Sequence, residues 1–101
     1  MIVNFSVVPL TEGESLSPYV AKMAGIVDKS GLDYKLTAMG TIIEGPWDKV
    51  MDTIKKCHNS MRRHSGRVLT SITVDDRKGA RKRLEGKVQS VQSKSKRAIS
   101  T

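Results

Sequence analysis

More than any other part of the chain, residues 39–47 constrain the fold, and they read Met-Gly-Thr-Ile-Ile-Glu-Gly-Pro-Trp. Gly40 is suited to a tight turn, and Gly45-Pro46 is typical of a helix start because proline fits the first helical position. The apolar residues between them predict a short strand. That strand carries a single carboxylate, Glu44, and a charge in an apolar strand points to a surface or a partner. The segment therefore predicts a turn, a strand and a helix, with one carboxylate fixed between them.

Four runs of the chain alternate with a period of two, which is typical of β-strands. In the first run, Val3, Phe5 and Val7 share one face, whereas Asn4 and Ser6 lie on the other. The runs cover residues 2–9, 32–39, 41–44 and 67–75. Only Gly40 separates the two middle runs, so we expect them to form a hairpin.

Two stretches carry apolar residues three and four positions apart, which predicts amphipathic helices. The first begins at Ser17-Pro18 and ends at Gly31, where glycine suits a left-handed exit. The second begins after Pro46 and ends before Gly66. It has the strongest apolar stripe of the chain, formed by Trp47, Val50, Met51, Ile54, Cys57, His58 and Met61. A thinner helical pattern covers residues 80–92, and a Lys/Ser-rich tail follows.

The predicted order is β-α-β-β-α-β with an additional C-terminal helix. A ferredoxin-like α+β sandwich satisfies this order and places both long helices on one face of the sheet. We therefore expect a single domain over residues 1–92 and a basic flexible tail over residues 93–101. The second face of the sheet is then open, and a subunit, the extra helix or a ligand must cover it.

The net charge of +8 comes entirely from the last quarter of the chain. Before position 77 the nine Lys/Arg residues balance nine Asp/Glu residues, whereas from Arg77 onward nine Lys/Arg residues face Glu85 alone. Such a segment is either a solvated helix face or a contact for phosphates, including those of nucleic acids.

Several classes of protein are disfavoured. No apolar run reaches the length of a membrane span, and the N-terminal residues lack the pattern of a signal peptide. A lone cysteine, Cys57, excludes an internal disulfide framework, so we expect a cytoplasmic protein. Cys57 and His58 are adjacent in a helix and do not face one another, so neither a zinc site nor a Cys–His pair is expected.

The pieces of the chain resemble a known family, the small ferredoxin-like thiamine-binding proteins, which are related to the thiamine/hydroxymethylpyrimidine-binding domain. The matching pieces are the strand end Val7-Val8-Pro9, residues 15–20, residues 39–45, Lys55 with His58, and residues 67–77. Among these, the Gly-Thr-x-x-Glu pattern at positions 40–44 is the most specific. The resemblance implies a non-catalytic homodimer or homotetramer that binds thiamine or its hydroxymethylpyrimidine moiety and needs no cofactor.

By this resemblance, Thr41 and Glu44 are ligand-binding residues, and Ser6 and Trp47 are added by inference. A carboxylate accepts a hydrogen bond from the amino group of an aminopyrimidine, and hydroxyl groups orient its ring nitrogens. An aromatic wall such as Trp47 covers a flat ring. The alternative readings are a strand-end charge or ion pair for Glu44 and core packing for Trp47. Glu44 can lie on either face of the sheet, because a shift of one residue in the strand register at Gly40 would turn its side chain to the other face.

Two other functions compete with small-molecule binding. One is a structural or regulatory oligomer, and the other is a nucleic-acid binder that uses the basic C-terminal segment. Sheets of this shape that recognise RNA stack bases on strand aromatics. The strand at residues 41–44 has no aromatic residue, so nucleic acid is the less expected partner.

Overall fold

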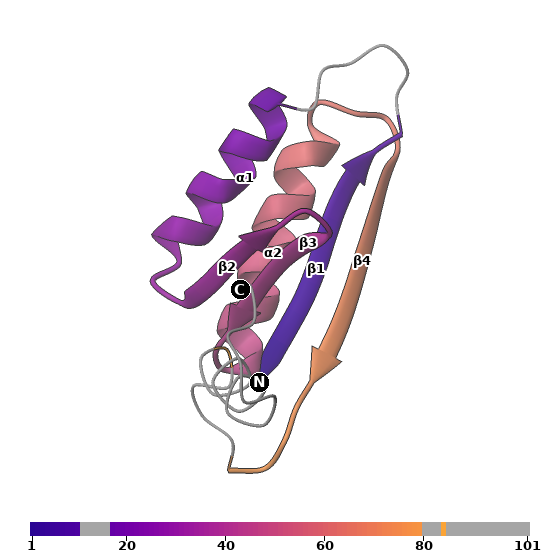
Figure 1. The fold of residues 1–101 in the computed structure, drawn as a ribbon. Helices are drawn as coiled ribbons and strands as arrows, with labels where there is room; N and C mark the ends of the chain where they lie inside the picture. Colours follow the sequence, from indigo (N-terminus) through magenta and orange to yellow (C-terminus); the bar gives the residue numbers. More distant parts are fainter. Residues whose placement is uncertain (11–16, 80–83, 85–101) are drawn as a thin grey trace, which may run out of the picture.

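The computed structural model of the protein describes residues 1–10, 17–79 and 84 (Figure 1). The elements are β1 (Ile2–Pro9), α1 (Ser17–Lys29), β2 (Asp33–Thr37), β3 (Gly40–Glu44), α2 (Trp47–Arg62) and β4 (Val68–Asp75). Apart from Leu84, the helix expected over residues 80–92 lies outside the described residues, and so does the tail expected over residues 93–101. Across the described ranges, no helix is long and apolar enough to cross a membrane.

The four strands form one antiparallel sheet in the order β2-β3-β1-β4. The central strand β1 pairs with β3 on one side and with β4 on the other, as expected when a βαββαβ chain places its first strand in the middle. The ferredoxin-like α+β fold predicted from the two periodicities is therefore confirmed.

The register of the sheet fixes which side chains share a face. Val3 pairs with Ile43, and Phe5 pairs with Thr41, so these residues point toward the same side. Both helices cover that side, and α2 lies behind the sheet in Figure 1. The core between the layers consists of Val3, Phe5, Val7, Val27, Ile43, Val50, Ile54, Cys57 and Met61.

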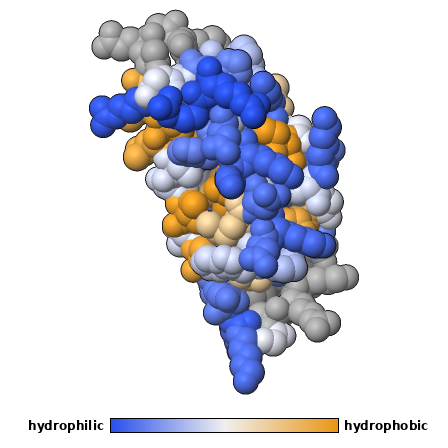
Figure 2. Space-filling model, turned by 180° about the vertical axis from the view of Figure 1, so that it is seen from behind, coloured by the Kyte–Doolittle hydropathy of each residue, from blue (hydrophilic) through white to orange (hydrophobic). Residues whose placement is uncertain are grey.

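The outer surface of the helix layer is polar. Seen from behind, a band of hydrophilic side chains runs along the molecule between smaller hydrophobic patches (Figure 2). Exposed charged residues of α2, including Asp48, Lys49, Lys55 and Lys56, belong to this surface. The helix is therefore amphipathic, as its stripe predicts.

The β2–β3 hairpin differs in one detail from the sequence-based expectation. The two-residue turn consists of Ala38 and Met39, and Gly40 is the first residue of β3, paired with Thr37. The Thr37 hydroxyl donates to the Gly40 carbonyl oxygen at 2.8 Å and accepts from the Met39 amide. Gly40 has a φ of 154°, and a Cβ atom there would lie 2.8 Å from the carbonyl oxygen of Phe5. Glycine is therefore required by the close approach of β1.

Candidate ligand-binding cavity

A cavity of about 380 Å³ lies between α1, β1 and the β2–β3 hairpin. Its volume falls within the range of small-molecule sites in proteins. On the sheet side the cavity is lined by Phe5, Val7 and Thr41, and on the α1 side by Val20, Met23, Ala24 and Val27. Leu36, Met39 and Met61 complete the wall. The lining is therefore almost entirely apolar.

The cavity exists because α1 covers the sheet with a mixture of large and small side chains. Val27 is fully buried, whereas Ala24, one turn earlier on the same side, is too small to fill the space above the sheet. Met23 and Met61 border the remaining volume, and unbranched methionine side chains adapt easily to an occupant. The hollow thus lies beneath α1, with Met61 of α2 at its wall.

Exposed apolar side chains frame the opening of this cavity. Val20, Leu36 and Met39 are all exposed although they are large and apolar, and Met39 at the hairpin tip keeps 85% of its surface accessible. Apolar residues grouped around a concave opening mark surfaces that bind a partner or a ligand.

Thr41 supplies the polar group best placed for a ligand. Its partner in the register is Phe5, so its side chain lies on the helix-covered face, where the residue is half-buried beside the cavity. Within the described ranges its hydroxyl makes no hydrogen bond, whereas the Thr37 hydroxyl is already used in the turn. No charged side chain of the described residues lines the cavity.

Glu44 occupies the opposite face of the sheet. It pairs with Ile2 and Asp33, and the odd spacing from Thr41 turns the two side chains to different sides. Three residues of strand separate their Cα atoms by about 10 Å. Glu44 keeps only 9% of its surface accessible, and its Oε1 atom accepts a hydrogen bond of 3.3 Å from the Leu84 amide.

The structure thus brings together some of the four predicted site residues. Thr41 and Ser6 border the cavity, although strand alternation turns the Ser6 side chain to the other face and leaves its backbone at the wall. Glu44 and Trp47 do not line it. Trp47 begins α2 with 54% of its surface exposed.

Ala24 is the residue of this cavity that sequence reasoning passes over. The apolar stripe of α1 accounts for Met23 and Val27, and an alanine within such a stripe attracts no notice. The available signal is a small residue on the core side of a helix, next to large ones.

Cys57 and His58, the other chemically reactive side chains considered from the sequence, are held in structural contacts. Cys57 is fully buried in the core, and this burial raises the pKa of its thiol to about 11. His58 lies next to it but turns toward β4, with its Nδ1 atom 2.6 Å from the Thr70 hydroxyl. In the part of the chain that the structure describes, no three His, Cys, Asp or Glu side chains gather as metal ligands would.

Comparison with known proteins places this architecture among relatives. The chain is 31% identical over 91 residues to the UPF0045 protein MJ1052 of Methanocaldococcus jannaschii, covering 90% of this chain and 91% of the relative. It is 33% identical over 96 residues to the UPF0045 protein YqgV of Bacillus subtilis, covering 89% and 92% of the two chains.

Solved structures agree with the fold. The crystal structure of MJ1052 superposes with a TM-score of 0.82 and covers 89% of this chain and 93% of that one. A Thermotoga maritima protein, provisionally described as a thiamine biosynthesis/salvage protein, superposes with a TM-score of 0.77 at 22% identity and covers 89% and 96%. The family model described as thiamine-binding protein matches residues 3–92. The chain therefore belongs to the thiamine-binding protein family.

Proposed function

We propose that this protein binds thiamine or its hydroxymethylpyrimidine moiety without catalysing a reaction, and that the cavity under α1 is the binding site. Membership of the thiamine-binding family supports a role in binding a small molecule. The observation that carries the proposal is the apolar cavity of about 380 Å³ with the Thr41 hydroxyl at its wall.

The chemistry of the cavity suits the pyrimidine half of thiamine. A methylated pyrimidine ring is flat and largely apolar, so Phe5, Met23 and Val27 bury its faces and edges. Its amino group and ring nitrogens need a hydrogen-bonding partner, and a threonine hydroxyl both donates and accepts. The pyrimidine moiety alone is therefore the smallest ligand expected to bind.

The thiazolium half is expected to stay at the opening. It carries a positive charge, and the described lining offers no carboxylate to balance that charge. The same lining lacks the histidine, carboxylate or amine that general acid–base catalysis requires. These two features support binding over catalysis.

Calorimetry with hydroxymethylpyrimidine tests the proposal and separates the two candidate polar residues. Thr41→Val removes the hydroxyl but keeps the branched shape, so we expect about tenfold weaker binding, equivalent to one lost hydrogen bond. Glu44→Gln keeps the shape of a residue on the other face, so we expect affinity close to that of the unmodified protein. Thr73→Val, an exposed threonine of β4 outside the cavity, is the matched control.

The outcomes point in different directions. Absence of heat at millimolar ligand, with folded protein, would end the proposal. A strong loss with Glu44→Gln and none with Thr41→Val would move the site to the face of the sheet that carries Glu44.

We further propose that the chain assembles in the cytoplasm as a homodimer or homotetramer. The support is the face of the sheet that α1 and α2 leave uncovered, on which the cross-strand partners Val8 and Leu69 are both exposed. A second copy would bury these side chains. Light scattering during gel filtration checks the assembly, and we expect Leu69→Glu to shift it toward monomer. A monomeric parent protein at every concentration would refute it.

A further inference from the structure

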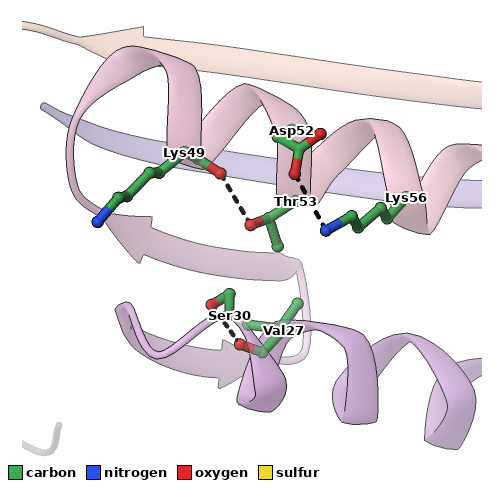
Figure 3. Close-up of polar contacts among 6 residues, drawn as sticks. All are labelled: Val27, Ser30, Lys49, Asp52, Thr53 and Lys56. Carbon is green, nitrogen blue, oxygen red and sulfur yellow. Dashed lines mark hydrogen bonds and ion pairs between the residues drawn. The ribbon is translucent and has the colours of Figure 1, made fainter.

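A second hollow lies between the end of α1 and the first half of α2. Its volume is also about 380 Å³, and it shares no lining residue with the cavity under α1. The polar residues that line it come from the end of α1, the residue after it and α2: Lys29, Ser30, Lys49, Asp52, Thr53 and Lys56. In the view of Figure 3, Ser30 lies just after the end of α1 and faces α2, which carries the other labelled polar residues. We call it the interhelical groove.

The interhelical groove carries an excess of positive charge. Lys56 forms an ion pair with Asp52, with 3.1 Å between Nζ and Oδ2. Within the described ranges neither Lys29 nor Lys49 forms an ion pair, and in Figure 3 the Lys49 ammonium extends away from the Asp52–Lys56 pair. Three lysines against one aspartate leave a formal charge of two, supplied from two different helices.

The neutral polar groups of the groove are already used. The Ser30 hydroxyl donates to the Val27 carbonyl oxygen, and the Thr53 hydroxyl donates to the Lys49 carbonyl oxygen at 2.9 Å (Figure 3). Their protons are therefore not available to a ligand, and the ammonium groups are the donors that remain on the side chains. A neutral sugar or alcohol would therefore find few free hydrogen-bonding groups in the groove, whereas an anion would interact with the charged ammonium groups.

The backbone at the end of α1 does not oppose an anion strongly. Helix C-termini repel negative charge through carbonyl oxygens that lack partners. Here the Val27 carbonyl accepts from the Ser30 amide at 3.1 Å as well as from the Ser30 hydroxyl. The Asp28 carbonyl accepts from the Gly31 amide at 3.4 Å. Lys29 in the last turn balances the rest of the helix dipole.

We propose that the interhelical groove binds a small anion with more than one negative centre, of the diphosphate class. Two ammonium groups on separate helices match charge spread over two phosphoryl groups better than the single charge of acetate or chloride. The volume of the groove exceeds that of one phosphate and accommodates two linked phosphates. The site is separate from the cavity under α1, so it stands whether or not that cavity binds thiamine.

Titration with inorganic pyrophosphate at low and constant ionic strength, followed by amide chemical shifts of residues 29–31 and 49–56, tests the groove directly. The variant is the double substitution Lys29→Gln with Lys49→Gln. The matched control is Lys22→Gln with Lys55→Gln, which also removes one exposed lysine from each helix but lies outside the groove. Both doubles change the net charge equally, so general electrostatic attraction affects them alike.

We expect saturable pyrophosphate binding that weakens about tenfold or more in the groove variant and changes less than about twofold in the control. Asp52→Asn frees Lys56, so it is expected to tighten binding severalfold. Orthophosphate at the same ionic strength is expected to bind more weakly than pyrophosphate. Equal weakening in both doubles, weaker binding in Asp52→Asn, or no saturation by folded protein at millimolar pyrophosphate would each overturn the proposal.

Hydroxymethylpyrimidine, added to the same samples, keeps this test distinct from that of the proposed function. The two ligands occupy sites with no shared residue, so we expect both to bind at once. Displacement of one ligand by the other would contradict the assignment of pyrophosphate to the groove.

Discussion

The two helices cover the same face of the sheet but differ in how many side chains they bury against it. α2 buries Val50, Thr53, Ile54, Cys57, Ser60 and Met61 along its length. α1 fully buries Val27 alone among its described side chains, and the cavity lies beneath it. The contrast indicates that α2 supplies most of the stability of the helix layer, whereas α1 shapes a space for a ligand.

Truncation of one large apolar residue on each helix is expected to show the largest difference. Ile54 of α2 is almost fully buried, so Ile54→Ala should lower the free energy of unfolding by about 2 to 5 kcal/mol. Met23 of α1 is half-buried at the edge of an existing cavity, so Met23→Ala should cost about 1 kcal/mol and weaken ligand binding. Urea unfolding of both variants measures the difference. Equal losses of stability would contradict the conclusion that α2 supplies most of the stability of the helix layer.

Alkaline pH is expected to weaken the α2 side through Cys57. Burial raises the pKa of its thiol from about 9 to about 11, so the folded state keeps a proton that the unfolded state releases. Stability from this group is therefore complete below pH 9 and falls as the pH rises toward 11, by roughly 2 to 3 kcal/mol. Unfolding measured from pH 8 to 11 checks this, with Cys57→Ala as the variant that should lack the decline.

Alkylation gives a second reading of the same residue. The thiolate is the reactive form, so Cys57 in the folded protein should react slowly with iodoacetamide at pH 8 and rapidly once urea unfolds the chain. Rapid alkylation without unfolding would show that the core beneath α2 opens more readily than its packing suggests.

The smallest expected effect concerns the attachment of α1 to β2. The Tyr34 hydroxyl donates to Asp28 Oδ1 at 2.9 Å, and this hydrogen bond, followed by desolvation and the negative charge of Asp28, raises the pKa of Tyr34. Asp28→Asn should lower that pKa toward the ordinary value for tyrosine. Ultraviolet titration of Tyr34 in a Tyr19→Phe background measures it. An unchanged pKa of Tyr34 would indicate that the hydrogen bond between Asp28 and Tyr34 does not hold the end of α1 against the sheet.

Periodicity predicted the four strands and the two long helices, with glycine and proline marking where they begin and end. The alternation of Val3, Phe5 and Val7 correctly predicts the buried face of β1, and the stripe containing Ile54 predicts that of α2. These patterns are reliable because side-chain direction repeats every two residues in a strand and about every 3.6 residues in a helix, whatever the tertiary surroundings.

The candidate site was less predictable for two physical reasons. The face of Glu44 depends on the register of the hairpin, and the close approach of β1 that requires glycine at position 40 comes from a segment distant in the sequence. The cavity depends on the space above Ala24, which is set by the distance between α1 and the sheet. Motif matching joined Thr41 and Glu44 in one site, whereas the strand carries them to opposite faces.

Because successive residues of β3 alternate between the two faces of the sheet, the position of Thr41 limits how relatives of this chain can differ in length. A single residue inserted between the hairpin turn and Thr41 would turn the Thr41 hydroxyl to the other face of the sheet, and Gly40 or the inserted residue would take its place beside the cavity. Two inserted residues would restore the original parity at the cost of a displaced strand. Length variation here should therefore be tolerated in even steps, so alignments of the family should show gaps of two before β3 more often than gaps of one.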